Sequence, residues 1–374
     1  MSWHTTFGEV AVRESVWRLP VPGGGYHRPF AARARVTARG CSRRLARAAA
    51  DFGCEQSFAR AGAQLWEHYG VRLGASTLRE LTLRQARAIA ARAAGAGPAR
   101  ALPKRGKAAV VVAEADGTML PVVEPRATAQ SRDKRKCRPV RWQEARLAAA
   151  QAQGGARAHF GATLEGGVEE VGARWGQAAK AAGWGLDGRV HAVGDGAPWL
   201  AEQAKSQFGK QGGYLLDFFH VSEYLAAAAA GLHPGDAPAA KAWLLAQQQA
   251  LKANQSAAVL ARLAAASEPA EVPEERAPAR CAHRYLSNRP DQLDYAGALA
   301  ADLPIGSGLI EAGHRHVLHA RLKVSGAWWL PANAEAMIQA RVARANGQWA
   351  ASWKPSRPGK QPAAAKPPKS TPHF

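Results

Sequence analysis

Two aspartates follow short apolar stretches that have the composition of buried β-strands. Residues 108–115 lead into Asp116, and residues 190–193 lead, through one glycine, into Asp195. A strand end is a recurrent place for catalytic acids, and the glycines next to both aspartates let other backbone or a ligand approach closely. Each aspartate taken singly also fits an ordinary turn or helix cap. The prediction of a catalytic site therefore depends on a third acidic residue.

Glu311 supplies that third carboxylate. It lies in the first turns of a helix predicted after the Gly-rich segment 303–308. If Asp116 and Asp195 end neighbouring strands and this helix packs across them, three acids meet without a basic partner. Like charges raise one another's pKa, and two divalent ions resolve the conflict. Oxygen ligands favour Mg²⁺ or Mn²⁺, and two such ions serve both the cutting and the joining of phosphodiesters.

The surrounding pattern predicts a mixed α/β domain. Further strands are expected at 156–164 and 190–193, with a helix at about 169–182 between them, and residues 214–219 form another apolar run. Residues 221–266 are rich in Ala, Leu and Gln at helical spacing, with a break at 231–235. We therefore expect a new domain beyond residue 107, with two or more helices over residues 221–266.

The N-terminal third is predicted to be a DNA-binding region. Residues 1–54 show only irregular structure and a possible short strand, whereas residues 55–93 read as helix, Gly-containing turn and helix. In a helix-turn-helix, the second helix would present Arg79, Arg84 and Arg87 to a major groove. An ordinary helical hairpin has the same pattern.

The remaining segments are a linker and basic stretches. Residues 94–107 read as a linker, and the tail 354–374 has five basic residues, no acidic ones and many prolines, which is typical of disorder. Residues 126–146 carry eight Lys and Arg against two acids, which fits either a solvated loop or an arm that faces DNA.

Composition favours a polyanionic partner. The 374 residues carry a formal net charge of +21, with a pI near 10.5. No apolar run approaches the ~20 residues that span a bilayer, and the first residues lack the order of a signal peptide, so we expect no membrane partner and a cytoplasmic, nucleoid-associated protein. The cysteines are far apart without a C-x-x-C pair, which predicts reduced thiols: Cys41, Cys54, Cys137 and Cys281.

Four segments in order resemble bacterial insertion-sequence transposases of the DDE type, especially the ISKra group. They are ADGTMLPVVE at 115–124, RVHAVGDGAPWL at 189–200, YLLDFFHVSEYL at 214–225 and LPIGSGLIEAGHRHVLHARLKVSGAWW at 303–329. The resemblance implies a ribonuclease-H-like core whose triad of metal ligands matches Asp116, Asp195 and Glu311. It also implies that residues 108–353 form the catalytic domain with a helical insertion at about 221–300, and that an N-terminal helical DNA-binding region precedes it.

Other residues near the triad in the sequence are expected to assist catalysis or to bind DNA. The resemblance matches an Asp-x-x-His element to Asp217 and His220, where the histidine either assists a proton step or is simply a satisfied side chain at a strand end. Arg321 and Lys323 follow Glu311 closely enough to hold phosphates, unless they only add surface charge. The adjacent tryptophans at 328–329 fit either base stacking or the core.

Taken together, the sequence predicts a transposase that binds terminal inverted repeats and target DNA. It would hydrolyse phosphodiester bonds and transfer strands with two Mg²⁺ or Mn²⁺ ions, as a homo-oligomer of at least two chains because a transposon has two ends. Two alternatives remain open at this stage. One is a non-catalytic DNA-binding protein, such as a decayed transposase or a regulator, and the other is a ribonuclease-H-like nuclease without joining activity.

Overall fold

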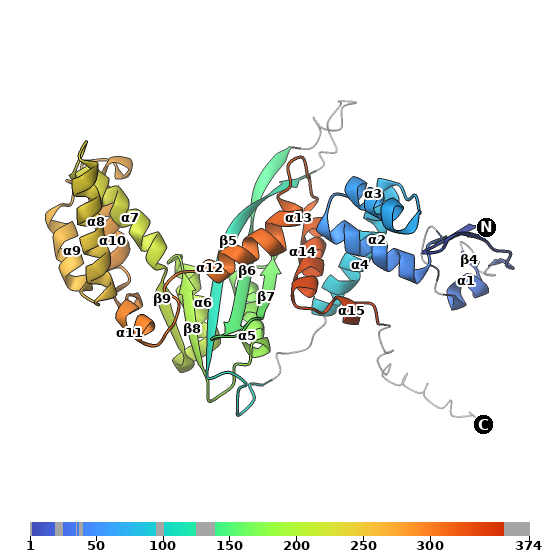
Figure 1. The fold of residues 1–374 in the computed structure, drawn as a ribbon, viewed down its shortest axis with the longest axis horizontal. Coiled ribbons are helices and arrows are strands. Elements are labelled where there is room, and N and C mark those ends of the chain that lie inside the picture. Colours follow the sequence, from blue (N-terminus) through green and yellow to red (C-terminus); the bar gives the residue numbers. More distant parts are fainter. Residues whose placement is uncertain are drawn as a thin grey trace, which may run out of the picture.

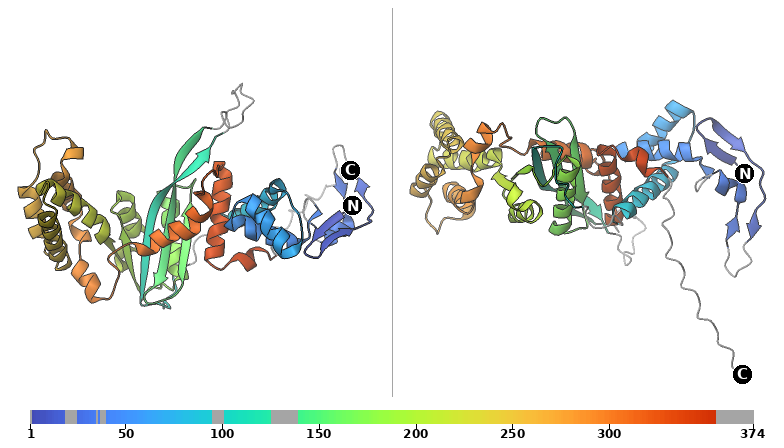
Figure 2. Two further views of the ribbon diagram at one scale, coloured as in Figure 1. Left: turned by 45° about the horizontal axis from the view of Figure 1, so that its top comes forward. Right: turned by 90° about the horizontal axis from the view of Figure 1, so that it is seen from below.

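A computed structural model describes residues 2–18, 25–34, 36, 40–94, 101–124 and 139–354. The molecule is elongated, and a group of helices stands at one end, a β-sheet in the middle and the N-terminal helices and hairpins at the other (Figure 1). The views in Figure 2 keep the same order along the long axis. The fold is therefore mixed α/β, as the sequence predicts.

The central sheet has five strands in the order β7-β6-β5-β8-β9. β5 pairs antiparallel with β6, which pairs antiparallel with β7, whereas β8 and β9 run parallel to β5. Their bounds are β5 (Val110–Val123), β6 (Val140–Ala152), β7 (Ala158–Thr163), β8 (Arg189–Gly194) and β9 (Gly212–Leu216). The strands expected near 108–116, 156–164 and 190–193 are thus confirmed, and the apolar run 214–219 begins inside β9.

β5 does not end where the sequence suggests. Asp116 lies in the middle of the strand, because β6 continues to pair with β5 from Asp116↔Leu147 as far as Val123↔Val140. Gly117 has a packing role here instead of ending the strand. A Cβ at this position would come within 2.3 Å of a carboxylate oxygen of Glu144 on β6.

Helices cover both faces of the sheet. α5 (Val168–Ala181) and α6 (Pro198–Phe208) pack on one face, where Val111 and Ala113 of β5 meet Trp175. The opposite face is covered by α14 (Pro331–Ala345) and by a continuous helical segment: α12 (Gly308–Gly313), the π-helical turn η5 (His314–His319) and α13 (Ala320–Leu322). Side chains alternate along a strand, so Glu114 and Asp116 face this second layer.

The helical insertion forms a unit with its own core. α7 (Phe218–Leu232), α8 (Ala237–Lys252), α9 (Ser256–Ala265), α10 (Pro278–Ser287) and α11 (Tyr295–Ala300) bury a shared set of apolar side chains. Short 3₁₀ turns η3 (Glu274–Arg276) and η4 (Pro290–Gln292) link them, and η2 (Gly209–Gln211) precedes β9. Leu215 and Leu216 of β9 belong to the same core, so the insertion is anchored directly on the sheet edge.

The N-terminal region is more ordered than its sequence indicates. β1 (Ser2–Thr5) pairs with β2 (Gly8–Ala11), β3 (Trp17–Arg18) pairs with β4 (Tyr26–His27), and α1 (Pro29–Arg33) follows. The expectation of irregular structure over residues 1–54 is wrong from residue 43, where α2 (Arg43–Glu55) begins. The Ser42 hydroxyl caps this helix, which buries Leu45, Ala46, Ala49, Ala50, Gly53 and Cys54.

α2 packs with the two helices that were predicted from the sequence. α3 (Phe58–Tyr69) ends at Gly70, whose φ of 60° is the left-handed conformation that glycine favours, and α4 (Ala75–Ala94) follows. We call α2, α3 and α4 the N-terminal bundle. One face of α4 packs on α14, and its Leu83, Ala86 and Ile89 belong to the same core as the sheet.

Several predicted segments fall outside the described residues. These are positions 95–100 of the expected linker, most of the basic segment 126–146, and residues 355–374 of the tail, which follows α15 (Trp349–Ser352). The described part of 126–146 belongs to β6 from Val140 onward. Among the described helices, none combines the length and the hydropathy needed to cross a membrane.

Candidate active site

Two alternate side chains of β5 meet two histidines of the helix that crosses the sheet. His314 Nε2 lies 3.2 Å from Asp116 Oδ2, and His319 Nε2 lies 2.9 Å from Thr118 Oγ1. The π-helical turn explains the match, because its i→i+5 repeat places residues 314 and 319 on one side. Their rings stack with centroids 5.7 Å apart. The helix therefore runs along β5 and presents imidazoles to a carboxylate and a hydroxyl.

His314 is the functional candidate that the sequence interpretation missed. Its contact with Asp116 lacks hydrogen-bond alignment, and both ring nitrogens are buried without a hydrogen-bond partner among the described residues. A buried polar group without a partner is costly and calls for an explanation, such as an absent ion. The signal in the sequence was its spacing, since residues three apart on a helix share a face and His314 follows Glu311 by three.

Glu114 is a second acid on the same face of β5. It is 1% exposed, and its Oε2 accepts a hydrogen bond of 2.7 Å from the amide of Ile310. The pKa of Glu114 is raised to about 8, chiefly by burial and also by the nearby Asp217 and Glu311 carboxylates, while amide hydrogen bonds from the start of α12 act in the opposite direction. The effect of both neighbours shows that three acids share one electrostatic environment.

Asp195 sits in a loop that the helical insertion holds in place. The hydroxyl of Tyr285 on α10 donates to the Asp195 carbonyl at 2.6 Å, and Arg289 donates to the Gly196 carbonyl at 2.7 Å. Gly196 has a φ of 83°, and a Cβ there would meet Leu216, Arg289 and Tyr285 at 3.0 Å or less. The Gly-Asp-Gly sequence is thus required by this close approach. The Asp195 carboxylate itself accepts from the amide of Ala197 at 2.9 Å.

Asp217 and His220 have structural partners. Asp217 is buried and caps α7: its Oδ1 accepts from the amides of Phe219 and His220 at 2.7 and 3.2 Å. Its Oδ2 accepts from the amide of Ser307 at 2.8 Å and from the same residue's hydroxyl. His220 is half-exposed and lies 3.4 Å from Glu223 on its own helix. Asp217 therefore joins β9, α7 and the start of α12.

The predicted triad comes from three elements of the sheet domain. Asp195 follows β8, and Asp116 lies on the neighbouring strand β5, two positions beyond Glu114, the last residue that pairs with β8. Glu311 is exposed in the first turn of α12, and Asp116 is 38% exposed. Within the described residues, however, no three His, Cys, Asp or Glu side chains lie close enough together to hold one metal ion. The three acids therefore come from adjacent strands and from a helix that packs on β5, but they do not form a metal-binding group in this arrangement.

The arginines expected on a recognition helix are exposed but not all free. Arg79, Arg84 and Arg87 lie on the exposed side of α4. Arg87 donates to the side chain of Asn333 on α14 at 2.8 Å. Since α4 also packs on α14 through its apolar face, the sheet domain occupies part of the surface that a free recognition helix would offer to DNA.

The expectation for Arg321 as a phosphate-binding residue is wrong. Arg321 is 3% exposed, lies between the rings of Phe58 and Trp329, and donates to the Gly53 carbonyl at 2.9 Å. Burial lowers its pKa to about 10. It joins the N-terminal bundle to the sheet domain. Lys323 differs, because it is exposed near the ring of Trp142 and remains available to an anion.

The neighbouring tryptophans divide between the two roles that the sequence left open. Trp329 is buried in the core at 6% exposure, whereas Trp328 is 46% exposed. The backbone carbonyl of Trp329 also accepts a hydrogen bond of 2.8 Å from the backbone amide of Val123. Only Trp328 is therefore placed to stack on a base.

Comparison with known families gives a match over the second half of the chain. Residues 186–357 match the model of an uncharacterised protein family, UPF0236. This stretch begins just before β8 and includes Asp195, Asp217 and Glu311, but not Asp116. A comparison with curated proteins gives no match. The matched stretch thus contains two of the three predicted triad acids, the helical insertion and α14.

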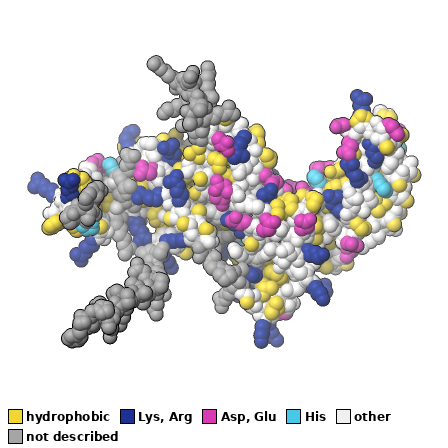
Figure 3. All heavy atoms as spheres, turned by 180° about the vertical axis from the view of Figure 1, so that it is seen from behind, with side chains coloured by type: hydrophobic (Ala, Val, Ile, Leu, Met, Phe, Trp, Pro, Cys, Tyr) yellow, Lys and Arg dark blue, Asp and Glu magenta, His cyan; other side chains and the backbone are white. Residues whose placement is uncertain are grey.

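Charge is distributed unevenly over the surface. Seen from behind, a group of acidic side chains lies over the middle of the molecule, basic side chains are numerous on the N-terminal part, and the helical insertion carries both kinds (Figure 3).

Proposed function

We propose that this protein is a DNA transposase that cuts and joins DNA at a ribonuclease-H-like site built from Asp116, Asp195 and Glu311. The observation that carries the proposal is the sheet. Its strand order, with β6 antiparallel and β8 and β9 parallel to β5, is the arrangement expected of a ribonuclease-H-like core. The proposal assigns the metal ligands to acids in the middle of β5, after the neighbouring strand β8, and on a helix that crosses the sheet.

The donor set suits hard divalent cations. Carboxylate oxygens are the ligands that Mg²⁺ and Mn²⁺ prefer, and the unpartnered imidazole of His314 offers a nitrogen beside Asp116. Asp116, Asp195 and Glu311 would hold the ions, which would supply activation of the attacking oxygen and stabilisation of the leaving oxygen. Because no three such ligands stand together among the residues that the structure describes, assembly of the full site with metal and DNA is part of the proposal.

Several side chains of the protein hold the backbone segments that carry the proposed metal ligands. Tyr285 and Arg289 fix the backbone on both sides of the Asp195 carboxylate, so its direction is set by the helical insertion. Asp217 ties the start of α12 to the end of β9 and thereby fixes the helix that carries Glu311. Lys323 and Trp328, both exposed, are the groups of this region that are open to a phosphate and a base.

The test compares the wild-type protein with Asp195→Asn on DNA that carries the element's ends, in Mg²⁺ or Mn²⁺. We expect cleaved and joined products from the wild type only, and equal DNA affinity for both proteins, because the amide keeps the shape of the side chain but not its charge. Loss of an essential ligand of this kind lowers rates by several orders of magnitude. Glu202→Gln, an acid on α6, is the matched control and should keep full activity.

The alternatives give different products in the same assay. Nicking without joining by the wild type favours a nuclease of the same fold. DNA binding without any metal-dependent product favours a non-catalytic regulator and overturns the proposal. With a DNA substrate that carries both ends, each joined product should be bound by at least two protein chains, because each DNA end needs its own active site.

A further inference from the structure

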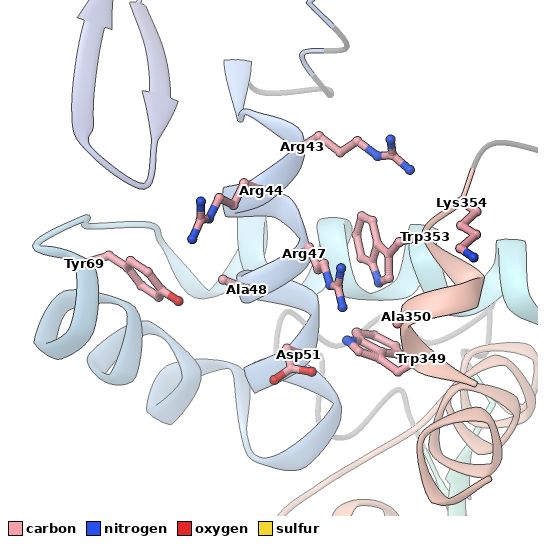
Figure 4. Close-up of a pocket in the computed structure, with 10 residues that line it drawn as sticks. All are labelled: Arg43, Arg44, Arg47, Ala48, Asp51, Tyr69, Trp349, Ala350, Trp353 and Lys354. Carbon is pink, nitrogen blue, oxygen red and sulfur yellow. The ribbon is translucent and has the colours of Figure 1, made fainter. Parts of the chain in front are cut away.

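A cavity outside the proposed active site lies between the N-terminal bundle and α15, and its lining includes none of Asp116, Asp195 and Glu311. Its volume is about 910 Å³, in the upper part of the usual range for ligand sites. The walls come from α2, from the end of α3 and from α15, as Figure 4 shows. Its lining residues are Arg43, Arg44, Arg47, Ala48, Asp51, Tyr69, Trp349, Ala350, Trp353 and Lys354.

The charge of this cavity is strongly positive. Arg43 and Arg47 lie one helical turn apart on α2, with Arg44 beside them, and none of the three has an ion-pair partner within the described part of the chain. The single acid in the lining, Asp51, is already bound by Arg344. Helical spacing therefore builds a cluster of uncompensated guanidinium groups, which suit phosphate oxygens.

Aromatic rings form the opposite wall. Trp349 and Trp353, also one turn apart, have ring centroids 6.0 Å apart in an edge arrangement, and both are partly exposed. In Figure 4 they face the side of α2 that carries Arg47 and Asp51. Arg344 lies 5.0 Å from the Trp349 centroid, so one face of that ring is already supported. Arginines opposite tryptophans match the two parts of a nucleotide, since a base stacks on an aromatic ring while its phosphate meets a cation.

We propose that this cavity binds an unpaired nucleotide of a DNA strand, with the phosphates on Arg43, Arg44 and Arg47 and the base against Trp349. The assignment rests on the proposed function, which supplies DNA as the partner, and it adds a contact outside the predicted recognition helix. Binding of the phosphate backbone of a DNA duplex would need only the arginines of this cavity. The tryptophan wall and the concave shape favour a base that is not stacked in a duplex.

The experiment measures binding to fluorescent single-stranded and duplex oligonucleotides of one sequence by anisotropy, in EDTA, so that cleavage plays no part. We expect Trp349→Ala to weaken single-strand binding about ten-fold and to leave duplex binding nearly unchanged, in line with the loss of one stacked base. Arg43→Gln with Arg47→Gln should weaken single-strand binding further and reduce its salt dependence, by a slope of roughly 0.7 for each lost phosphate contact. Arg276→Gln, an exposed arginine on the helical insertion, is the control and should change neither.

A wild-type measurement guards against variants that fail to fold. An oligonucleotide carrying one bromodeoxyuridine should crosslink under ultraviolet light to Trp349 or Tyr69, identified by peptide mass spectrometry. Crosslinks that map only to other residues, or unchanged single-strand affinity in folded variants, would overturn this assignment. Neither outcome would overturn the proposed function, which the cutting and joining assay tests separately. A wild type that binds neither oligonucleotide would overturn the assignment as well.

Discussion

At the scale of single residues, two cations with the same expected role have opposite environments. Arg321 is buried between Phe58 and Trp329, while Lys323 is exposed two positions later. The π-helical turn that precedes α13 changes the phase of the helix, so spacing from Glu311 did not indicate which side chain points inward. Their substitutions should therefore separate stability from DNA binding.

We expect Arg321→Ala to lower the free energy of unfolding by about 2–4 kcal/mol, because it removes a buried guanidinium, two ring contacts and the partner of the Gly53 carbonyl. Lys323→Gln should change stability by no more than about 0.5 kcal/mol, as surface substitutions usually do. Urea denaturation followed by circular dichroism measures both. A stability loss for Arg321→Ala as small as that for Lys323→Gln would contradict the buried placement.

Tyr285 and Arg289 are positioning residues in this structure, since they touch backbone beside Asp195 and no reacting group. Tyr285→Phe keeps the ring stack with Tyr224 but loses the hydroxyl, so we expect about ten-fold slower cleavage with unchanged DNA affinity. Hydrogen exchange at residues 194–197 should become faster in the same variant. Tyr224→Phe is the control, and unchanged exchange in Tyr285→Phe would show that the hydroxyl does not hold this loop.

At the scale of elements, the ends of α2 and α14 are joined by a cluster of ion pairs. Arg341 Nη1 lies 2.5 Å from Glu55 Oε2, Arg344 Nε lies 2.5 Å from Glu55 Oε1, and Arg344 also binds Asp51. Burial opposes the charge on Glu55, but the two guanidinium groups outweigh it and hold its pKa below the ordinary value of 4.5. A lowered pKa contributes stability above pH 4.5, and this contribution disappears as the pH falls through the folded-state pKa.

We therefore expect Glu55→Gln to be destabilising at neutral pH, by on the order of 1 kcal/mol because the carboxylate is half-exposed and screened. The difference from the wild type should shrink as the pH falls from 4.5 through the lowered folded-state pKa of Glu55, below which both proteins carry a neutral group. Thermal melts from pH 3.5 to 7 measure the difference, with Glu67→Gln on α3 as the control. A constant difference across this range would contradict the ion pairs.

The sequence predicts elements better than it predicts contacts between them. Periodicity indicated β5, β8 and the helix of Glu311, because period and turn glycines are local properties. Periodicity did not indicate α2, although Ser42 and the apolar spacing after it are helix signals. The frequent glycines and prolines of residues 1–54 favoured a prediction of irregular structure instead. Glu114 and His314 escaped notice because their roles depend on the crossing of a strand and a helix almost two hundred positions apart.

At the scale of the whole molecule, the N-terminal bundle and the sheet share one hydrophobic core. Leu83, Ala86 and Ile89 of α4 bury against the layer that contains Met337 and Ile338 of α14. The linker interpretation of residues 94–107 implied two units that are independent of each other. The shared core, the ion pairs of Glu55 and the buried Arg321 imply instead that the bundle holds a fixed position on the sheet domain.

This arrangement predicts joint unfolding. Residues 43–94 and the strands β5 to β7 should lose hydrogen-exchange protection together as urea increases, because separating them exposes the apolar face of α14. The helical insertion has its own core and should open separately or at lower urea. Mass spectrometry of peptides from each part follows the three groups in one experiment. Loss of protection in the bundle well before the strands would mean that α4 is free to leave α14, which would restore the view of a recognition helix that acts independently of the catalytic domain.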